Sequence, residues 1–195
     1  MTGPGPGDPD PGEFDRLRRR VLWAMPTGLF VVGSRAGERR NLMTCNWVMQ
    51  VATTPKLVAV AVEAGSLTRD LVEQGGTFSV SLLARSERSL VRKFVKPVRD
   101  VTLDGGGVAV AMQGEPVVEV VGGLPCLAAS VAWLACRVRT VDTWDGLVDD
   151  GDAGVAASHV LVVGEVVAVG GSDRLGGSAD DAVLSMDDTR MSYGG

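Results

Sequence analysis

The chain has 195 residues, which is enough for one domain with a full hydrophobic core and too few for two ordinary domains. Its net charge of −5 argues against nucleic-acid binding, because duplex binding needs a dominant basic surface. No apolar run approaches the roughly 20 residues that a membrane-spanning helix requires. Apolar residues make up 45% of the chain, aromatic residues only 5%, and the Val-rich runs favour strands. We therefore expect a mostly β protein.

Cysteine and histidine are too few for a disulfide framework or a conventional metal site. Cys45, Cys126 and Cys136 form an odd number without C-x-x-C spacing. His159 is the single histidine, so a His-based metal site is almost excluded and no convincing catalytic triad can be assembled. The sequence therefore indicates a reduced, cytoplasmic protein without a metal centre, and it argues against a hydrolase.

The N-terminal half of the chain is predicted to contain a tail, helices and strands. Residues 1–12 are rich in Pro and Gly and are expected to form a disordered tail. Apolar residues at helical spacing predict an amphipathic helix over Glu13–Met25. A helix is also expected over Leu67–Gln74, with Gly75-Gly76 as its stop. Strands are expected over Leu29–Gly33, 41–51, 57–63 and 77–83.

The C-terminal half is predicted to consist mainly of antiparallel strands. Ser86–Val95 has the pattern of a further helix, ended by Pro97. Residues 141–154 are acidic and Gly-rich and are expected to form an exposed loop, and residues 172–195 a mobile tail. Strands are expected near 108–112 and 116–121, and over Leu127–Thr140 and Val155–Val169.

These elements favour a single domain, residues 13–171, built as a Greek-key barrel with a few short helices. A parallel βαβ protein is disfavoured because only two convincing helices interrupt many strands. No G-x-G-x-x-G pattern follows the first strand, which removes the main sequence support for a Rossmann dinucleotide-binding domain.

Small polar side chains gather where a strand and a helix are expected to meet. Ser66 is a natural N-cap for the helix over Leu67–Gln74, and Thr68 lies in the first turn of that helix. A helix start offers free backbone amides, so a cap is compatible with a phosphate site. Thr44 and Asn46 either contact a ligand or face solvent through simple alternation. The arrangement suits an anionic, phosphate-bearing cofactor.

A cluster of basic residues stands out in this acidic chain. It suits a small anionic ligand, and it equally fits the solvated face of a helix. Its members are Arg85, Arg88, Arg92, Lys93, Lys96 and Arg99.

Four motifs follow one another along the chain. They are NLMTCNW at 41–47, ATTPK at 52–56, SLT at 66–68, and H-x5-E from His159 to Glu165. In this order they resemble the flavin reductase-like family of FMN-binding split barrels, over roughly residues 21–169 and the last residues. The chain departs from the family pattern at Lys56, which stands where a second Pro is usual, and at Ser158, which stands where an Asp precedes the His.

The resemblance implies an FMN-binding split β-barrel that forms a homodimer. It implies hydride transfer from NAD(P)H to FMN, with FAD as the other candidate flavin, and delivery of reduced flavin to a partner monooxygenase. The flavin carries the chemistry, so the protein is expected to supply binding, orientation and electronic tuning. Two alternatives remain open: a flavin-dependent oxidoreductase acting on a specific organic substrate, and a flavin carrier without turnover of its own.

The resemblance also implies roles for particular residues. It places His159 beside the nicotinamide or flavin as the catalytic residue, although a lone His entering a strand is also a common structural feature. It suggests phosphate contacts from Ser66, Thr68 and Lys93. The full set of expected cofactor-binding residues is Asn41, Met43, Thr44, Cys45, Asn46, Ser66, Thr68, Arg92, Lys93, Phe94 and Tyr193.

Simpler roles stay open for four of these residues. Arg92 and Lys93 fit solvated charge, and Phe94 fits core packing. Tyr193 would either cover the cofactor or belong to an unstructured chain end.

Overall fold

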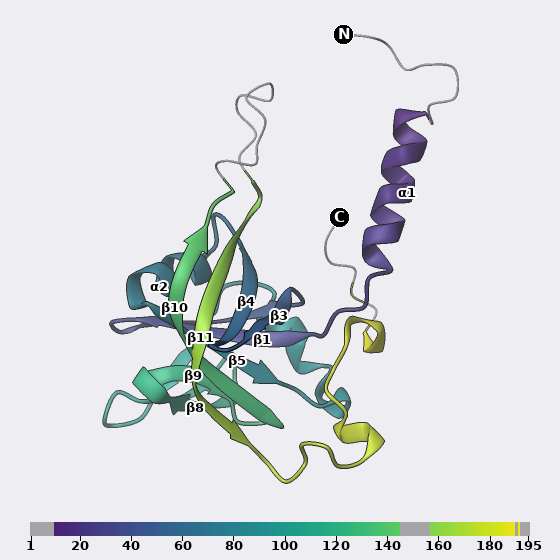
Figure 1. The fold of residues 1–195 in the computed structure, drawn as a ribbon. Coiled ribbons are helices and arrows are strands. Elements are labelled where there is room, and N and C mark those ends of the chain that lie inside the picture. The colour runs from purple at the N-terminus through teal and green to yellow at the C-terminus, as the bar shows by residue number, and fades with distance from the viewer. Residues whose placement is uncertain (1–9, 145–156, 190, 192–195) are drawn as a thin grey trace.

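The computed structural model describes residues 10–144, 157–189 and 191, and within them the fold is mostly β, as the sequence predicts. Figure 1 shows antiparallel sheets with helix α2 (Leu67–Gly75) packed beside them, while helix α1 (Pro11–Trp23) stands apart. Among the described residues no helix combines the length and the apolar character that crossing a membrane demands.

The larger sheet is a barrel that is split open along one seam. A flat seven-stranded sheet would hold its edge strands almost 30 Å apart, at about 4.8 Å per strand. Here the two edge strands are joined by Asn46 and Trp47 alone, a connection that spans about 10 Å at most. The sheet must therefore curl until its edges approach. The strand order is β2 (Arg39–Cys45), β1 (Phe30–Ala36), β5 (Thr77–Leu82), β10 (Ala132–Asp142), β11 (His159–Gly171), β4 (Lys56–Glu63) and β3 (Val48–Thr53).

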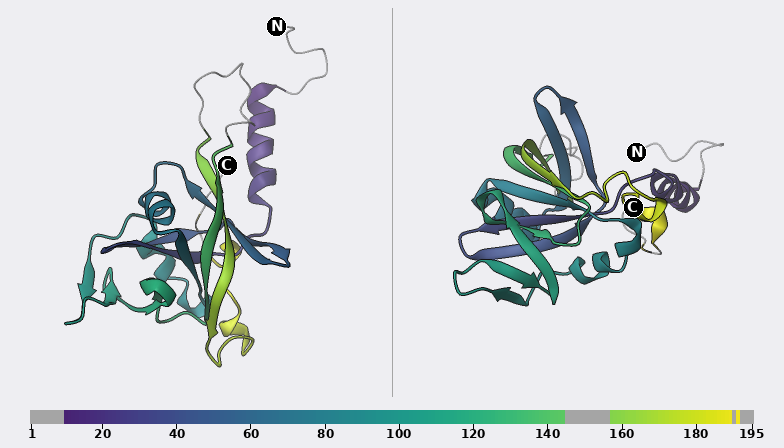
Figure 2. Two further views of the ribbon diagram at one scale, coloured as in Figure 1. Left: turned by 60° about the vertical axis from the view of Figure 1, so that its left-hand side comes forward. Right: turned by 90° about the horizontal axis from the view of Figure 1, so that it is seen from below.

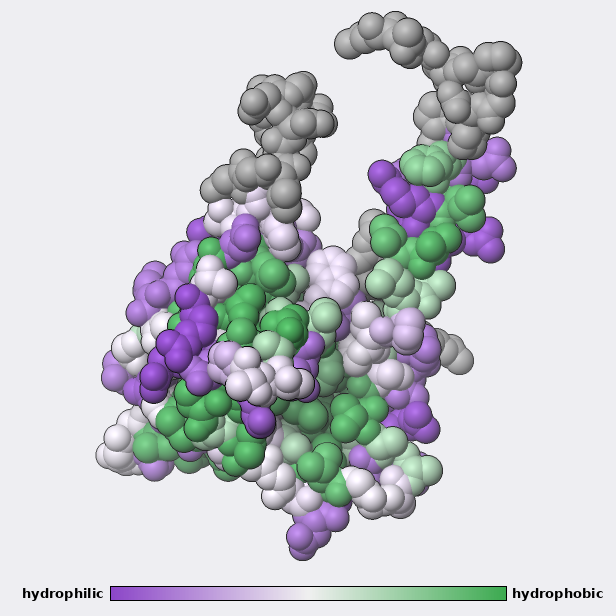
Figure 3. Space-filling model, viewed as in Figure 1, coloured by the Kyte–Doolittle hydropathy of each residue, from purple (hydrophilic) through white to green (hydrophobic). Residues whose placement is uncertain are grey.

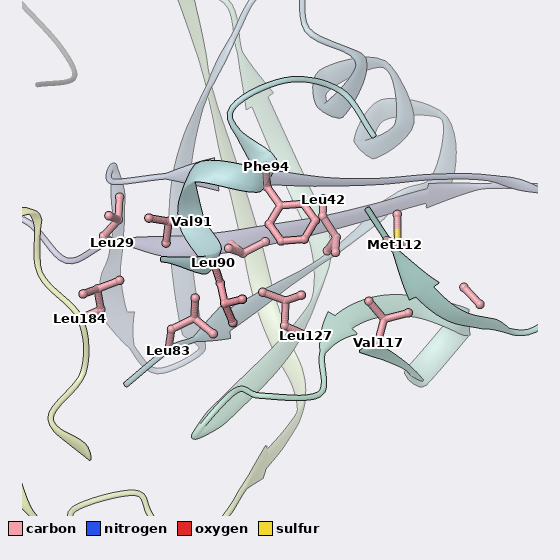
Figure 4. Close-up of a cluster of buried hydrophobic side chains, with 12 residues drawn as sticks. Leu29, Leu42, Leu83, Leu90, Val91, Phe94, Met112, Val117, Leu127 and Leu184 are labelled. Carbon is pink, nitrogen blue, oxygen red and sulfur yellow. The ribbon is translucent and has the colours of Figure 1, made fainter. Parts of the chain in front are cut away.

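A second, smaller sheet covers one side of the barrel. Its strand β9 packs across β1, β5 and β2, and short 3₁₀ turns complete this layer. Figure 4 shows Leu90, Val91 and Phe94 of the 3₁₀ turn η2 (Leu90–Phe94) in one cluster with Leu42 and Leu127. The strands of the smaller sheet are β6 (Val101–Leu103), β7 (Ala109–Met112), β8 (Glu115–Val120) and β9 (Leu124–Leu127).

The prediction of one strand over 41–51 is wrong in a way that matters for the site. β2 ends at Cys45 and β3 begins at Val48, on the opposite edge of the sheet. No Gly or Pro interrupts residues 41–51, so the sequence carries no strong turn signal at this corner. Asn46 and Trp47 therefore lie at the seam of the split barrel.

The α-helix predicted over Ser86–Val95 is also wrong. This stretch forms two 3₁₀ turns, η1 (Arg85–Glu87) and η2. The Thr44 hydroxyl donates a 2.5 Å hydrogen bond to the Val91 carbonyl, which takes that carbonyl out of any continuous α-helical ladder. Strands β6 and β9 were not predicted because three or four residues show no clear alternation.

Part of the segment that the sequence predicted as a mobile tail is anchored to the core. Leu184 is fully buried, and its backbone bridges two other segments. The Leu184 amide donates to the Leu83 carbonyl, and the Leu184 carbonyl accepts from the Leu29 amide, both at 2.9 Å. Two 3₁₀ turns flank it, η5 (Ala179–Asp181) and η6 (Met186–Asp188).

A buried ionic cluster fastens the smaller sheet to β1 and β2. The Glu119 carboxylate of β8 accepts from Arg40 at 2.6 Å, from Arg35 at 3.0 Å and from the Ala109 amide at 2.9 Å. The Arg40 side chain is only 2% exposed and also donates to the Gly107 carbonyl. The cluster thus connects elements far apart in the sequence, directly before the Asn41 that begins the site.

Candidate functional site

A cavity of about 190 Å³ opens where β2 ends. Its wall is built from five segments of the chain. They are β2 from Asn41 on with the seam residues, the end of β4, the start of α2, residues 95–97 after η2, and the start of β11. Eight of the twelve site residues predicted from the sequence line it. They are Asn41, Met43, Thr44, Cys45, Asn46, Ser66, Thr68 and His159.

The start of α2 presents unused hydrogen-bond donors to this cavity. Ser66 is the N-cap, and its hydroxyl accepts from the Arg69 amide at 3.2 Å, as the sequence predicts. The next helical bond runs from the Asp70 amide to the Ser66 carbonyl. Within the described residues the amides of Leu67 and Thr68 have no acceptor, and both residues line the cavity. A helix start with free amides attracts anions.

Asn41 and Thr44 form the frame of the cavity. The Asn41 amide donates to the Thr68 hydroxyl at 2.9 Å, and its carbonyl accepts from the Val98 amide at 2.9 Å. Thr44 is bonded to the Val91 carbonyl, as described above. These side chains thereby tie α2 and the segment after η2 to β2. Their polar groups already have protein partners, so direct flavin contact through them remains only a prediction.

Asn46 differs from those two residues because its side chain is unpaired. It is 5% exposed, it lines the cavity, and within the described part of the chain no hydrogen bond satisfies its amide. Its amide is absent from the buried, unsatisfied polar atoms of the described residues, so the amide opens on the cavity and its donors and acceptor are available to a ligand. Asn46 therefore offers unpaired hydrogen-bonding groups to the cavity.

His159 sits at the rim, held by three neighbours. Its ring lies 4.7 Å from the Trp47 ring in an edge-on arrangement, with an interplanar angle of 73°. Its Nδ1 is 2.9 Å from the Ser158 hydroxyl. On the adjacent strand β4, Glu63 lies directly opposite. Burial lowers the pKa of His159 below its ordinary value, and the Glu63 carboxylate opposes this effect.

Cys45 is an inert part of the wall. Burial raises the pKa of its thiol to about 12, so the thiol stays protonated at neutral pH. Its Sγ lies 3.5 Å from the Ala61 carbonyl. We expect packing, and no redox chemistry, from this residue.

The remaining predicted residues lie elsewhere. Lys93 does not line the cavity, and its side chain pairs with Glu115. Arg92 is exposed and does not line the cavity either. Phe94 is fully buried in the core. Lys96, three residues further on, is the basic side chain among the described residues that does line the cavity. Tyr193 lies outside the described residues.

A larger groove of about 860 Å³ continues from the cavity. The two spaces share Asn46, Trp47 and Ala61, so the seam of the barrel separates them only partly. The end of α1 with the residues after it, the start of β3, Ala59 of β4, Leu161 of β11 and the segment around Met186 form its other walls. Together the two spaces have the size range of pockets for drug-sized ligands or cofactors.

A family model described as the flavin reductase like domain matches residues 22–192. The chain belongs to this family. The matched range contains the whole cavity wall and the groove beside it, and the split-barrel fold predicted from the sequence is thereby confirmed.

Two relatives named as flavin reductases resemble the chain over most of its length. The NADH-dependent FAD reductase of Streptomyces globisporus is 29% identical over 154 residues, which covers 78% of this chain and 75% of that protein. The NADH-dependent flavin reductase StyB of Pseudomonas fluorescens is 28% identical over 123 residues, covering 63% of this chain and 65% of that protein.

Solved structures of the family share the fold. The NADH:FAD oxidoreductase SgcE6 of Streptomyces globisporus superposes with a TM-score of 0.61 at 24% identity, covering 87% of this chain and 89% of its own. The styrene monooxygenase flavin reductase of Pseudomonas putida gives 0.58 at 25% identity, covering 80% and 87%. SgcE6 has also been solved in complex with NAD and FAD fragments.

Proposed function

We propose that this chain is an NADH-dependent flavin reductase that binds FMN, or FAD in its place, and supplies reduced flavin to a partner monooxygenase. The observation that carries the proposal is the Asn46 amide, which has no hydrogen-bond partner among the described residues and lines the same cavity as the free amides of Leu67 and Thr68. One feature suits the polar edge of a planar ring, and the other suits a phosphate. FMN carries both groups.

Different residues of the cavity would contact different parts of the cofactor. The amides at the start of α2, with the Lys96 ammonium, would hold the phosphate. Asn46 would bond the ring edge, and Trp47 with His159 would border the space for the nicotinamide in the adjoining groove. The flavin supplies the hydride-accepting chemistry, and the protein orients the two partners and excludes water.

The names of the relatives support NADH as the reductant and a monooxygenase as the user of the product. Two relatives are named as NADH-dependent, and one further relative is the reductase component of 4-hydroxyphenylacetate 3-monooxygenase from Thermus thermophilus. We also propose a cytoplasmic location, where NADH is available and where the three free cysteines would remain reduced.

Titration of the flavin-free protein with FMN tests the proposal. We expect flavin fluorescence to be quenched with a Kd of about 1 μM or tighter, equivalent to about −8 kcal/mol. Anaerobic addition of NADH should then bleach the visible absorbance of the bound flavin. Failure of both FMN and FAD to bind below about 1 mM would refute the proposal. Tight binding without bleaching by NADH or NADPH would instead indicate a flavin carrier.

The phosphate contact can be tested with a matched pair of lysine variants. Lys96→Ala should weaken FMN binding about tenfold and leave riboflavin, which lacks the phosphate, almost unaffected. Lys93→Ala removes the same charge three residues away from a side chain that pairs with Glu115, so it serves as the control. Fluorescence titration with both ligands measures the effect. Equal losses for FMN and riboflavin in Lys96→Ala would place this lysine away from the phosphate.

We further propose that the protein is a homodimer that uses α1 in its interface. Figures 1 and 2 show α1 to one side of the sheets in every view, and Figure 3 shows hydrophobic residues along it. Such a surface is unusual on a monomer. Its exposed apolar residues are Phe14, Leu17, Val21, Leu22 and Trp23. Sedimentation velocity at micromolar concentration should give twice the mass of the chain, and a monomer would contradict this part of the proposal.

A further inference from the structure

The rim of the cavity carries a carboxylate that the proposed function has not yet used. Glu63 is the last residue of β4 and His159 is the first residue of β11, and the two face each other across the antiparallel ladder. Directly opposite residues in such a ladder have Cβ atoms about 5 Å apart and project from the same face of the sheet. Both residues line the cavity.

The alternation of β4 confirms which face this is. Val60 and Val62 are 1% exposed and point into the core, so Ala61 and Glu63 occupy the other face, toward the cavity. The Ala64 amide donates to the Ser158 carbonyl at 2.9 Å, which fixes the two strand ends beside each other. Glu63 has no ion-pair partner among the described residues, in contrast to most carboxylates of the described strands.

We propose that Glu63 is a positioning residue that acts through His159, by setting how much of the imidazole is protonated. The Ser158 hydroxyl engages Nδ1 and the Trp47 ring packs against the imidazole, so these two contacts leave Nε2 for the cavity side. The other titratable groups that face this space are Cys45 of β2 and Lys96 after η2. Cys45 stays neutral, and Glu63 is the one carboxylate among the described residues that line this cavity, so the charge that favours the imidazolium comes from Glu63.

The residue before His159 is Ser158, which offers no carboxylate, so the carboxylate that faces the imidazole comes from the neighbouring strand. Its kinetic consequence rests on the proposed function: if His159 positions the nicotinamide, the pH dependence of flavin reduction contains the pKa of His159. Removal of the Glu63 charge lowers this pKa. The corresponding limb of the pH–rate profile then moves to lower pH, whichever protonation state of His159 supports the reaction.

NMR titration of the flavin-free protein tests the electrostatic part without relying on activity. The chain contains one histidine, so the imidazole signals belong to His159 without further assignment. We expect Glu63→Gln to lower its pKa by about 0.5–1 unit, and Glu63→Asp to restore most of the difference. The control is Glu165→Gln, which removes the same charge from β11 six residues away and should shift the pKa by less than about 0.2 unit.

An unchanged pKa in Glu63→Gln, or an equal shift in Glu165→Gln, overturns the proposal. The second arm measures the rate of flavin bleaching by NADH against pH in the same variants. A limb that moves with the NMR pKa supports the role of Glu63 in the reaction. A limb that does not move, in a protein whose His159 pKa has shifted, overturns that role. Absence of flavin reduction in the wild type would refute the proposed function and leave the NMR result standing.

Discussion

His159→Ala should slow the reduction of bound flavin by NADH up to about a hundredfold, with little change in FMN affinity. The reason is geometric. The groups that would hold FMN lie at the start of α2, at Lys96 and at Asn46, whereas His159 lies at the rim beside Trp47, where the cavity meets the larger groove. Loss of the imidazole would therefore leave the flavin in place and misplace the nicotinamide. Stopped-flow bleaching after mixing with NADH, together with an FMN titration, separates the two effects.

Ser158→Ala is the matched control for this experiment. It removes the hydroxyl 2.9 Å from Nδ1 and keeps the imidazole, so the rate should fall much less than in His159→Ala. An unchanged rate in His159→Ala would return the histidine to a structural role at the start of β11. A parallel loss of FMN affinity would show that His159 contacts the flavin and does not act on the nicotinamide alone.

Local patterns predicted much of the fold and part of the site. The helix over Leu67–Gln74, its Ser66 cap and its glycine stop all appear, because they depend on neighbours within a few residues. Strands 57–63 and 77–83 appear for the same reason. The cluster of Thr44, Asn46 and Ser66 at one cavity could be predicted only through the resemblance to the family, since these residues come from different elements.

Which basic residues line the cavity, and which further residues join it, depends on contacts between distant segments. Lys93 and Lys96 are equivalent in the sequence pattern, and only the 3₁₀ geometry of η2 and the pairing with Glu115 turn one away from the cavity. Strand register places Glu63 opposite His159, and the seam of the barrel places Trp47 against the His159 ring. Neither leaves a periodic signal, since each looks like an ordinary residue at a strand end.

Removal of the Glu119 carboxylate should produce a large loss of stability. Glu119→Ala is expected to lower the free energy of unfolding by about 3–5 kcal/mol, because it removes the close charge partner of Arg40, whose side chain is 2% exposed, and leaves it only the exposed Glu38 carboxylate at 3.7 Å. It also removes the acceptor of the Ala109 amide and the link to Arg35. Urea unfolding at neutral pH measures the change, and an unaltered m-value would show that the unfolded state is not responsible.

Glu115→Ala on the same strand is the control, since its pairing with the half-exposed Lys93 should contribute less than about 1 kcal/mol. A small loss in Glu119→Ala would mean that water enters the cluster and solvates Arg40, so that the smaller sheet is held by apolar packing alone.

A large loss of stability has a consequence for function as well. Arg40 immediately precedes Asn41, whose two hydrogen bonds position α2 and the segment carrying Lys96. We therefore expect the FMN affinity of the variant, measured where it remains folded, to fall together with its stability.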